Sequence, residues 1–79
     1  MTIKVINAVY GGNNGKSKDV TEIVQSFVNS GKTTFTVDNQ TMGGDPDFGV
    51  VKKFQAMYLP QGEMIPKNVE ATEGQKVTL

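Results

Sequence analysis

The strongest strand signal in the chain is Val50-Val51-Lys52-Lys53-Phe54-Gln55-Ala56-Met57-Tyr58-Leu59. Its side chains alternate, because successive residues of a strand point to opposite faces of a sheet. One face carries Phe54, Ala56 and Tyr58, and the other carries Lys53, Gln55 and Met57. The run predicts a strand over residues 50–59.

The methionines can belong either to the core or to a binding surface. Methionine more often fills gaps in small cores, so we expect Met57 in the core and leave the positions of Met42 and Met64 undecided.

Four further strands are expected on either side of this one. They span residues 3–10, 33–37, about 64–71 and 76–79, which are rich in β-branched or aromatic types or lie between turn residues. A tight turn at 60–63 joins the central strand to the next. Because proline cannot donate to a ladder, Pro66 predicts that the 64–71 strand lies at a sheet edge or carries a bulge.

One short helix is expected between the first two strands. Its apolar residues recur with helical spacing on one stripe: Val20, Ile23, Val24, Phe27 and Val28. Asp19 stands where an N-cap belongs, and Glu22 three residues later completes a variant of the capping box. Asn29-Ser30-Gly31 supplies the stop. An extended segment is the alternative, because β-branched residues weaken helix propensity.

These elements predict a β-dominated α+β fold, a small antiparallel β-meander or sandwich of about five strands with one short helix. Residues 1–79 are expected to form a single domain, because so short a chain cannot support two cores. Because the chain has only 37% hydrophobic residues and no disulfide, we expect a low free energy of unfolding. We therefore expect a homo-oligomer.

Composition excludes several classes of function. Eight lysines balance eight carboxylates and arginine is absent, which disfavours binding to a nucleic acid polymer or to an anionic membrane. Without cysteine or histidine the chain lacks thiolate zinc sites and the usual nucleophile–base pairs. We expect no enzyme, no metal and no cofactor. The N-terminus, Met1-Thr2-Ile3-Lys4-Val5, shows no signal peptide or membrane span, so we expect a cytoplasmic protein.

The first candidate site is the glycine-rich loop after the first strand. It comprises Gly11, Gly12, Asn13, Asn14 and Lys16, with Tyr10 and Lys18 at its ends. Backbone N–H groups of such loops can cradle a phosphate near a helix start. The spacing is not that of a Walker loop, although Gly15-Lys16-Ser17 copies its end, and Asp19 would repel an anion. A plain connecting loop is the alternative.

The second candidate site is the segment 43–49, within a long loop over residues 38–49 that is dense in turn residues. It contains Gly44 and the carboxylates of Asp45 and Asp47. Phe48 stands beside these carboxylates and just ahead of Lys52 and Lys53, so its ring can stack on a ligand or insert into a partner. Two alternatives remain. The loop is a structural turn, or its oxygen donors bind calcium, although the spacing of an EF-hand is missing. Those donors are Asp38, Asn39, Asp45 and Asp47.

Several residues spread along the chain carry a resemblance to a known family. They are Tyr10-Gly11, Asp19-Val20-Thr21, Asp45-Pro46, Gly49, Lys52, Tyr58, Gly62 and Gly74. Together they resemble the C-terminal domain of unknown function in a mitochondrial J-domain co-chaperone family. The resemblance implies a module for protein association without catalytic residues. Because this sequence carries no J domain, we expect a stand-alone use of the module.

Two hypotheses of function follow. In the first, a small homo-oligomer sequesters a small anionic, nucleotide-like ligand between the 11–18 and 43–52 loops of neighbouring subunits, as phage proteins sequester immune signals. Tyr10 and Phe48 would stack, and Lys16, Lys18 and Lys52 would pair charge. In the alternative, the chain is a protein-interaction adaptor that uses a sheet face or the edge near Pro66.

Overall fold

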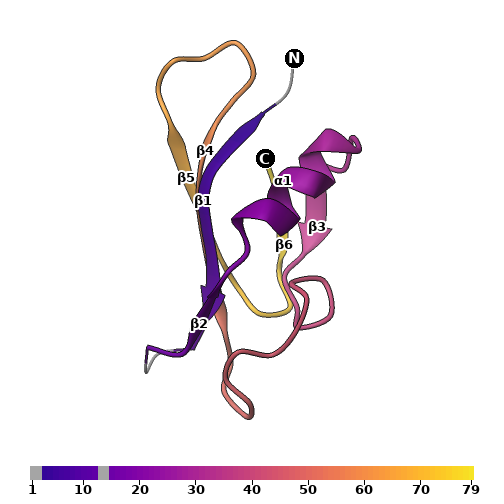
Figure 1. Cartoon of the computed structure of the whole chain (residues 1–79), viewed down its shortest axis with the longest axis vertical. Helices are drawn as coiled ribbons and strands as arrows, with labels where there is room; N and C mark the ends of the chain where they lie inside the picture. The colour runs from indigo at the N-terminus through magenta and orange to yellow at the C-terminus, as the bar shows by residue number, and fades with distance from the viewer. Residues whose placement is uncertain (1–2, 13–14) are drawn as a thin grey trace.

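Two antiparallel sheets and one helix make up the fold in a computed structural model, which describes residues 3–12 and 15–79 (Figure 1). The elements in chain order are β1 (Lys4–Gly11), β2 (Ser17–Asp19), α1 (Thr21–Asn29), β3 (Thr34–Thr36), β4 (Lys53–Leu59), β5 (Lys67–Thr72) and β6 (Lys76–Thr78). The predicted fold class, β-dominated and antiparallel with one short helix, is confirmed.

The larger sheet has the strand order β2-β1-β4-β5, and β3 pairs with β6 in a second sheet. All pairs are antiparallel, and a bulge interrupts the β1–β4 register between Val5 and Asn7. In Figure 1, α1 and the β3–β6 sheet lie on the same side of the larger sheet. The core therefore fills the space between one face of the larger sheet and this second layer.

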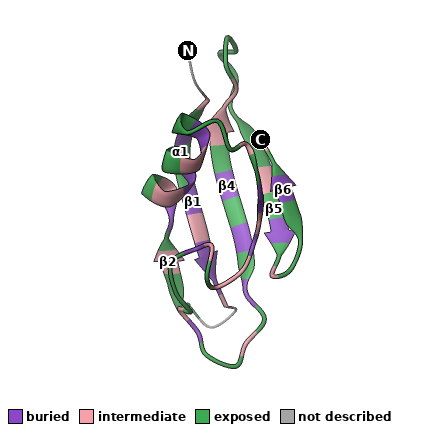
Figure 2. Ribbon diagram, turned by 90° about the vertical axis from the view of Figure 1, so that its right-hand side faces the viewer, coloured by how far each residue is buried: buried purple, intermediate pink, exposed green. Residues whose placement is uncertain are grey.

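Alternation along the strands supplies the sheet side of the core. On β4, Phe54 and Ala56 are buried, whereas Lys53 and Gln55 are exposed, which Figure 2 shows as alternating bands. The Phe35 ring packs edge-on against Phe54, with ring centroids 5.7 Å apart. Such aromatic pairs stabilise a core by about 0.5–1.5 kcal/mol beyond the area that they bury.

The helix contributes the stripe that its spacing predicts. Val20, Val24 and Val28 are buried, and Ile23 and Phe27 pack against the same core. The predicted capping box is wrong, because the residue in the N-cap position is Val20. Asp19 lies one residue earlier, in β2, and its Oδ1 accepts the Thr21 backbone N–H at 2.9 Å.

The predicted stop of the helix is confirmed. Gly31 has φ 84°, a conformation that favours glycine. The N–H of Gly31 donates to the Val28 carbonyl at 3.0 Å, and that of Lys32 to the Phe27 carbonyl at 2.8 Å. This pair of bonds is a Schellman motif, which satisfies carbonyls that the helix end would leave open.

Several strand boundaries differ from the sequence prediction. The loop after β1 is shorter than expected, because Ser17–Asp19 returns as β2 and pairs with the end of β1. β4 begins at Lys53 rather than at residue 50, and β5 begins after Pro66. β5 does lie at the edge of its sheet, as that proline predicts.

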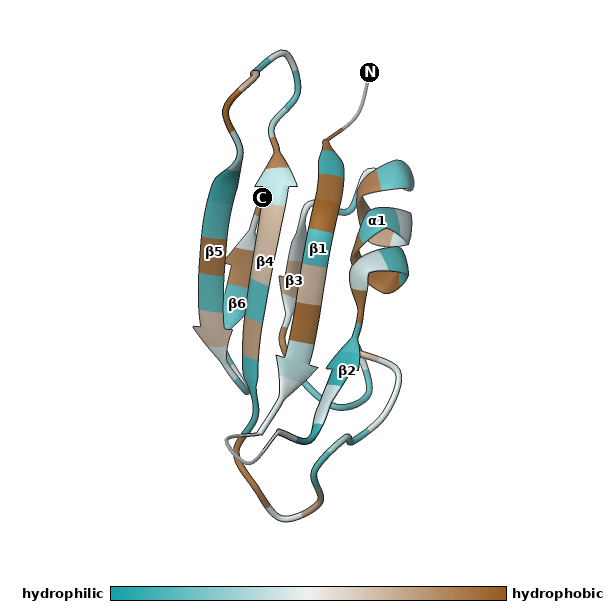
Figure 3. Cartoon of the chain, turned by 60° about the vertical axis from the view of Figure 1, so that its left-hand side comes forward, coloured by the Kyte–Doolittle hydropathy of each residue, from teal (hydrophilic) through white to brown (hydrophobic). Residues whose placement is uncertain are grey.

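The second face of the larger sheet is open. Met57 lies there with 39% of its surface exposed, so its predicted core position is wrong. Met42, by contrast, is fully buried in the core. Figure 3 shows hydrophobic and hydrophilic residues interspersed along β1 and β4. Within residues 3–12 and 15–79, no helix is long and apolar enough to cross a membrane.

Candidate functional site

Both candidate loops lie at one end of the molecule and touch each other within a single chain (Figure 1). Lys18 Nζ donates to the Gly43 carbonyl at 2.8 Å. Gly12 packs against the Asp47 carboxylate so closely that a Cβ at Gly12 would collide with Oδ2. One chain thus joins the 11–18 and 43–52 loops without help from a second subunit.

The glycine-rich segment turns a β-hairpin. The Gly12 N–H donates to the Lys16 carbonyl at 3.0 Å, and Gly15 has φ 80°. Gly11 belongs to β1, where a side chain would collide with Ser17. These glycines therefore have a structural reason to be glycine. Asn13 and Asn14, two of the predicted site residues, lie outside the described residues.

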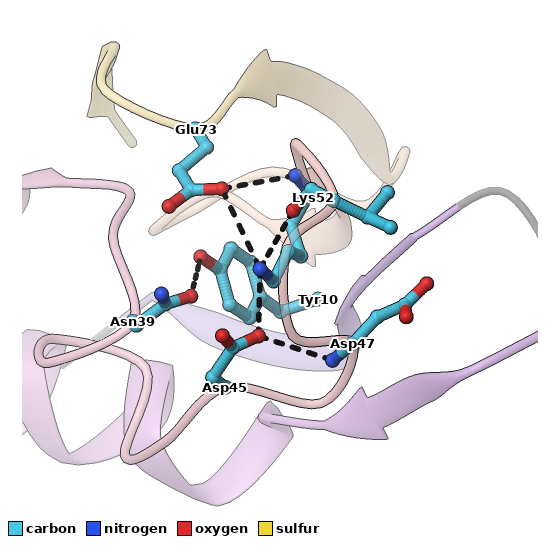
Figure 4. Close-up of polar contacts among 7 residues, drawn as sticks. Tyr10, Asn39, Asp45, Asp47, Lys52 and Glu73 are labelled. Atoms are coloured by element: carbon cyan, nitrogen blue, oxygen red, sulfur yellow. Dashed lines mark hydrogen bonds and ion pairs between the residues drawn. The ribbon is translucent and has the colours of Figure 1, made fainter.

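Lys52 is the buried centre of a polar cluster behind the longer loop (Figure 4). Its side chain is only 3% exposed, and Nζ lies 2.6 Å from Asp45 Oδ1 and 3.9 Å from Glu73 Oε1. Nζ also donates to the Val50 carbonyl at 2.6 Å. The Lys52 backbone N–H donates to Glu73 Oε1 at 3.0 Å, and the Glu73 N–H to the Lys52 carbonyl at 2.9 Å.

The contacts between Lys52 and Glu73 tie the loop to the turn between β5 and β6. Glu73 lies in this turn, 21 residues after Lys52. Because a buried ammonium is stable only when it is paired and hydrogen-bonded, the cluster fixes the backbone around Lys52. The Lys52 hydrogen bond also holds the pKa of the Asp45 carboxyl below its ordinary value, so this carboxylate stays charged.

Tyr10 extends the cluster from β1. Its ring is fully buried, and its hydroxyl donates to Asn39 Oδ1 at 2.6 Å. Burial first, and then the charges of Glu73, Asp45 and Asp38, raise the pKa of Tyr10 to about 12. The phenol is therefore a neutral hydrogen-bond donor that anchors the start of the long loop.

Asp47 is a buried carboxylate in the middle of the long loop, with 5% of its surface exposed. Its backbone N–H donates to Asp45 Oδ1 at 3.1 Å. Its Oδ2 has no hydrogen-bond partner among the described residues. Asp47 therefore packs the two loops together, although its buried Oδ2 accepts no hydrogen bond from a described residue.

The calcium alternative finds no support. Asp38 Oδ1 accepts the Thr41 N–H at 2.6 Å, and the hydrogen bonds from Thr41 lower the pKa of Asp38. Asp38 thus stabilises a turn at the start of the loop. In the part of the chain that the structure describes, no group of three or more acidic, histidine or cysteine side chains could hold a metal ion.

A pocket of about 560 Å³ opens beside the Lys52 cluster. Its lining consists of Asp38, Asn39, Asp45, Gly49, Val50, Val51, Lys52, Glu73 and Gly74. Three of these residues are carboxylates, and the one lysine is already paired with Asp45. The pocket lining therefore combines three carboxylates with two valines.

The loop exposes two large apolar side chains at this end of the molecule. Phe48 is 92% exposed and Val51, which also lines the pocket, is 64% exposed. Gly49 between them has φ 80°, a backbone conformation that glycine adopts without strain. Exposed aromatic side chains on a fixed backbone are typical of contact residues in protein interfaces.

The structure separates the predicted site residues into two groups. Gly12, Lys16, Lys18, Gly44, Asp45 and Phe48 are at least partly accessible. Tyr10 and Lys52 are buried, so the predicted stacking by Tyr10 and the free charge of Lys52 are wrong. Gly11 is a buried strand residue.

The sequence does not predict the contact of Glu73 with Lys52 or the structural role of the Asn39 side chain. Nothing in the sequence around Glu73 signals its pairing with Lys52, 21 positions earlier. The Asn39 side chain was considered only as a calcium donor, whereas it accepts the Tyr10 hydroxyl.

Comparison of the chain with protein-family models, with curated proteins and with solved structures finds no match. The resemblance to a co-chaperone C-terminal domain therefore stays a prediction.

Proposed function

We propose that the chain is a non-enzymatic module that binds a protein partner through Phe48 and Val51 and through the adjoining pocket. The observation that carries the proposal is the 92% exposure of Phe48 on a loop whose base is tied by the buried Lys52. An aromatic anchor on a preorganised loop loses little conformational freedom on binding, which favours affinity.

The chemistry of the pocket indicates the character of the partner surface. Asp38, Asp45 and Glu73 line the pocket, and no unpaired ammonium of a described residue does. A partner with an apolar hollow for Phe48 and a basic group near these carboxylates is complementary to this surface. The proposal agrees with the protein association that the family resemblance implies.

Sequestration of a small anionic ligand is the less favoured proposal. The pocket carboxylates repel an anion, and two of the groups expected to hold it, Tyr10 and Lys52, are buried and already bonded. Lys16 remains exposed in the β1–β2 hairpin and is the best remaining contact.

The experiment compares the chain with two matched variants as affinity baits in extracts of the source organism. Phe48→Ala removes the proposed anchor, and Met64→Ala removes a side chain that is also 92% exposed, in the β4–β5 loop at the opposite end (Figure 1). A captured partner is then purified, and its Kd is measured for all three baits.

We expect Phe48→Ala to raise the Kd at least about thirtyfold, as loss of an interface hot spot does, and Met64→Ala to leave it within about twofold. Equal affinity of the wild-type and Phe48→Ala baits would overturn the proposal. Calorimetric titration with ATP and with a cyclic dinucleotide tests the other function. Micromolar binding that Lys16→Ala abolishes would establish anion binding in its place.

A further inference from the structure

The outer edge of β5 is a place where a second chain can pair. β5 is the last strand of the β2-β1-β4-β5 sheet, so only one of its two sides is hydrogen-bonded to a described strand. The Glu73 N–H points inward, to the Lys52 carbonyl, whereas the Thr72 N–H donates to the Gln75 side chain at 2.8 Å. Backbone groups alternate in direction along a strand. The groups of Asn68, Glu70 and Thr72 therefore face outward.

Both ends of this edge are closed to a partner strand. Pro66, the next outward position before Asn68, has no N–H to donate. The Thr72 N–H is already used by Gln75 Oε1. The open part of the edge consists of the backbone groups of Asn68 and Glu70, which lie on either side of Val69.

This pattern is self-complementary. We propose that two copies of the chain pair antiparallel along β5, about a two-fold axis at Val69, so that Asn68 lies opposite Glu70 of the second copy. Each of the two symmetric pairs then exchanges both backbone hydrogen bonds. The two larger sheets become one continuous sheet across the dimer.

Other registers leave backbone groups unpaired or oppose like charges. An axis at Glu70 places the two Glu70 carboxylates opposite each other and pairs Asn68 with the occupied N–H of Thr72. An axis at Asn68 pairs Glu70 with Pro66, which cannot donate. Only the axis at Val69 uses every open group.

The side chains agree with this register. Asn68 and Glu70 are both exposed, and Gln55 Nε2 donates to Glu70 Oε1 at 3.2 Å, which holds the carboxylate on the open face. The Asn68 amide of one copy faces this carboxylate in the other and can donate to it. So small a contact belongs to the weak, transient class of interface.

The first test changes the sign of the charge at one exposed position. Asn68→Lys places an ammonium opposite Glu70 of the second copy, and Asn68→Glu places a carboxylate there. Both change the net charge of a neutral chain by one, so their general repulsion is equal. In analytical ultracentrifugation we expect Asn68→Lys to lower the dimer Kd and Asn68→Glu to raise it, each by roughly 2- to 30-fold. Monomers at every concentration for both variants and the wild type would overturn the proposal.

The second test traps the pair covalently in a chain that has no cysteine of its own. At the axis the two Val69 Cα atoms lie about 4.5 Å apart, within the range that a disulfide spans. Mild oxidation is expected to cross-link Val69→Cys and to leave Thr72→Cys monomeric, because the two Thr72 positions lie roughly 20 Å apart. Equal cross-linking of both variants would rule out this register. The Phe48→Ala variant is expected to dimerise as the wild type does, so this inference and the proposed function fail separately.

Discussion

The ammonium nitrogen of Lys52 lies 2.6 Å from Oδ1 of Asp45, seven residues earlier on the same loop. The contact closes the loop that carries Phe48 on itself, and Glu73 then ties the closed loop to the β5–β6 turn. The loop that carries the exposed apolar side chains is thus held by a polar cluster around the buried Lys52 rather than by regular strand pairing.

Lys52→Met is expected to destabilise the protein by about 2 kcal/mol, because it keeps the apolar stem and removes the charge that pairs Asp45. The value lies below that for a fully buried pair, since the Asp45 side chain is 25% exposed and can be hydrated. Urea unfolding measures the change. Lys53→Met, at the neighbouring exposed lysine, is the control and is expected to stay within about 0.5 kcal/mol. Equal losses for the two variants would show that the cluster does not stabilise the fold.

Acid is expected to loosen this end of the molecule. The pKa values of Asp45, Asp38 and Asp19 all lie below the ordinary 3.8, mainly through hydrogen bonds from Lys52, Thr41 and Thr21. A lowered folded-state pKa gives stability that is complete above the unfolded value and is lost as the pH falls through the folded value. The thermal midpoint is therefore expected to hold from neutral pH to about 4 and to drop below it.

Asp45→Asn tests the share of this carboxylate in the acid response. The variant is less stable at neutral pH, and its thermal midpoint falls less steeply below about pH 4 because one linked group is gone. Glu22→Gln makes the same change in net charge on the exposed side of α1 and is the control. A profile of Asp45→Asn that runs parallel to the wild type would contradict the assignment.

The spacing of apolar residues predicts the helix and the strands, because it depends on which side chains each element buries. The helical stripe from Val20 to Val28 and the alternation at Phe54 and Ala56 both report burial directly, and both are confirmed. The same rule would have placed Tyr10 correctly, since it shares a face of β1 with the buried Ala8. Its position beside a glycine-rich loop, by contrast, indicates a ligand contact.

The site was harder to predict because its contacts are distant in sequence. Val50 and Val51 are β-branched and indicate a strand. In the structure, however, the Lys52 ammonium donates to the Val50 carbonyl, and β4 begins only at Lys53. The antiparallel pairing of β4 with β5 brings its partner Glu73 beside Lys52. No periodicity in the sequence carries that information.

Alkaline conditions test the burial of Tyr10. Its folded-state pKa of about 12 exceeds the ordinary 10.0, because burial and the nearby carboxylates disfavour the phenolate. A raised pKa gives stability that is complete below pH 10 and is lost as the pH rises towards 12. In Tyr58→Phe, which leaves Tyr10 as the single tyrosine, near-ultraviolet absorbance is expected to show ionisation well above pH 10. Ionisation near 10 in a chain that keeps its native circular dichroism would contradict this burial.

The contact between Gly12 and Asp47 joins the β1–β2 hairpin to the long loop and can be tested by a double-mutant cycle. Gly12→Ala adds a Cβ that collides with Asp47 Oδ2, and Asp47 is buried and has little room to move. Overpacking of this kind costs about 1–3 kcal/mol. Asp47→Ala removes the obstructing carboxylate, so Gly12→Ala is expected to cost much less in that background. Urea unfolding of the four proteins gives the coupling energy. Additive losses would mean that the two loops do not touch at this point, whereas a coupling above about 1 kcal/mol would establish the contact that holds them together.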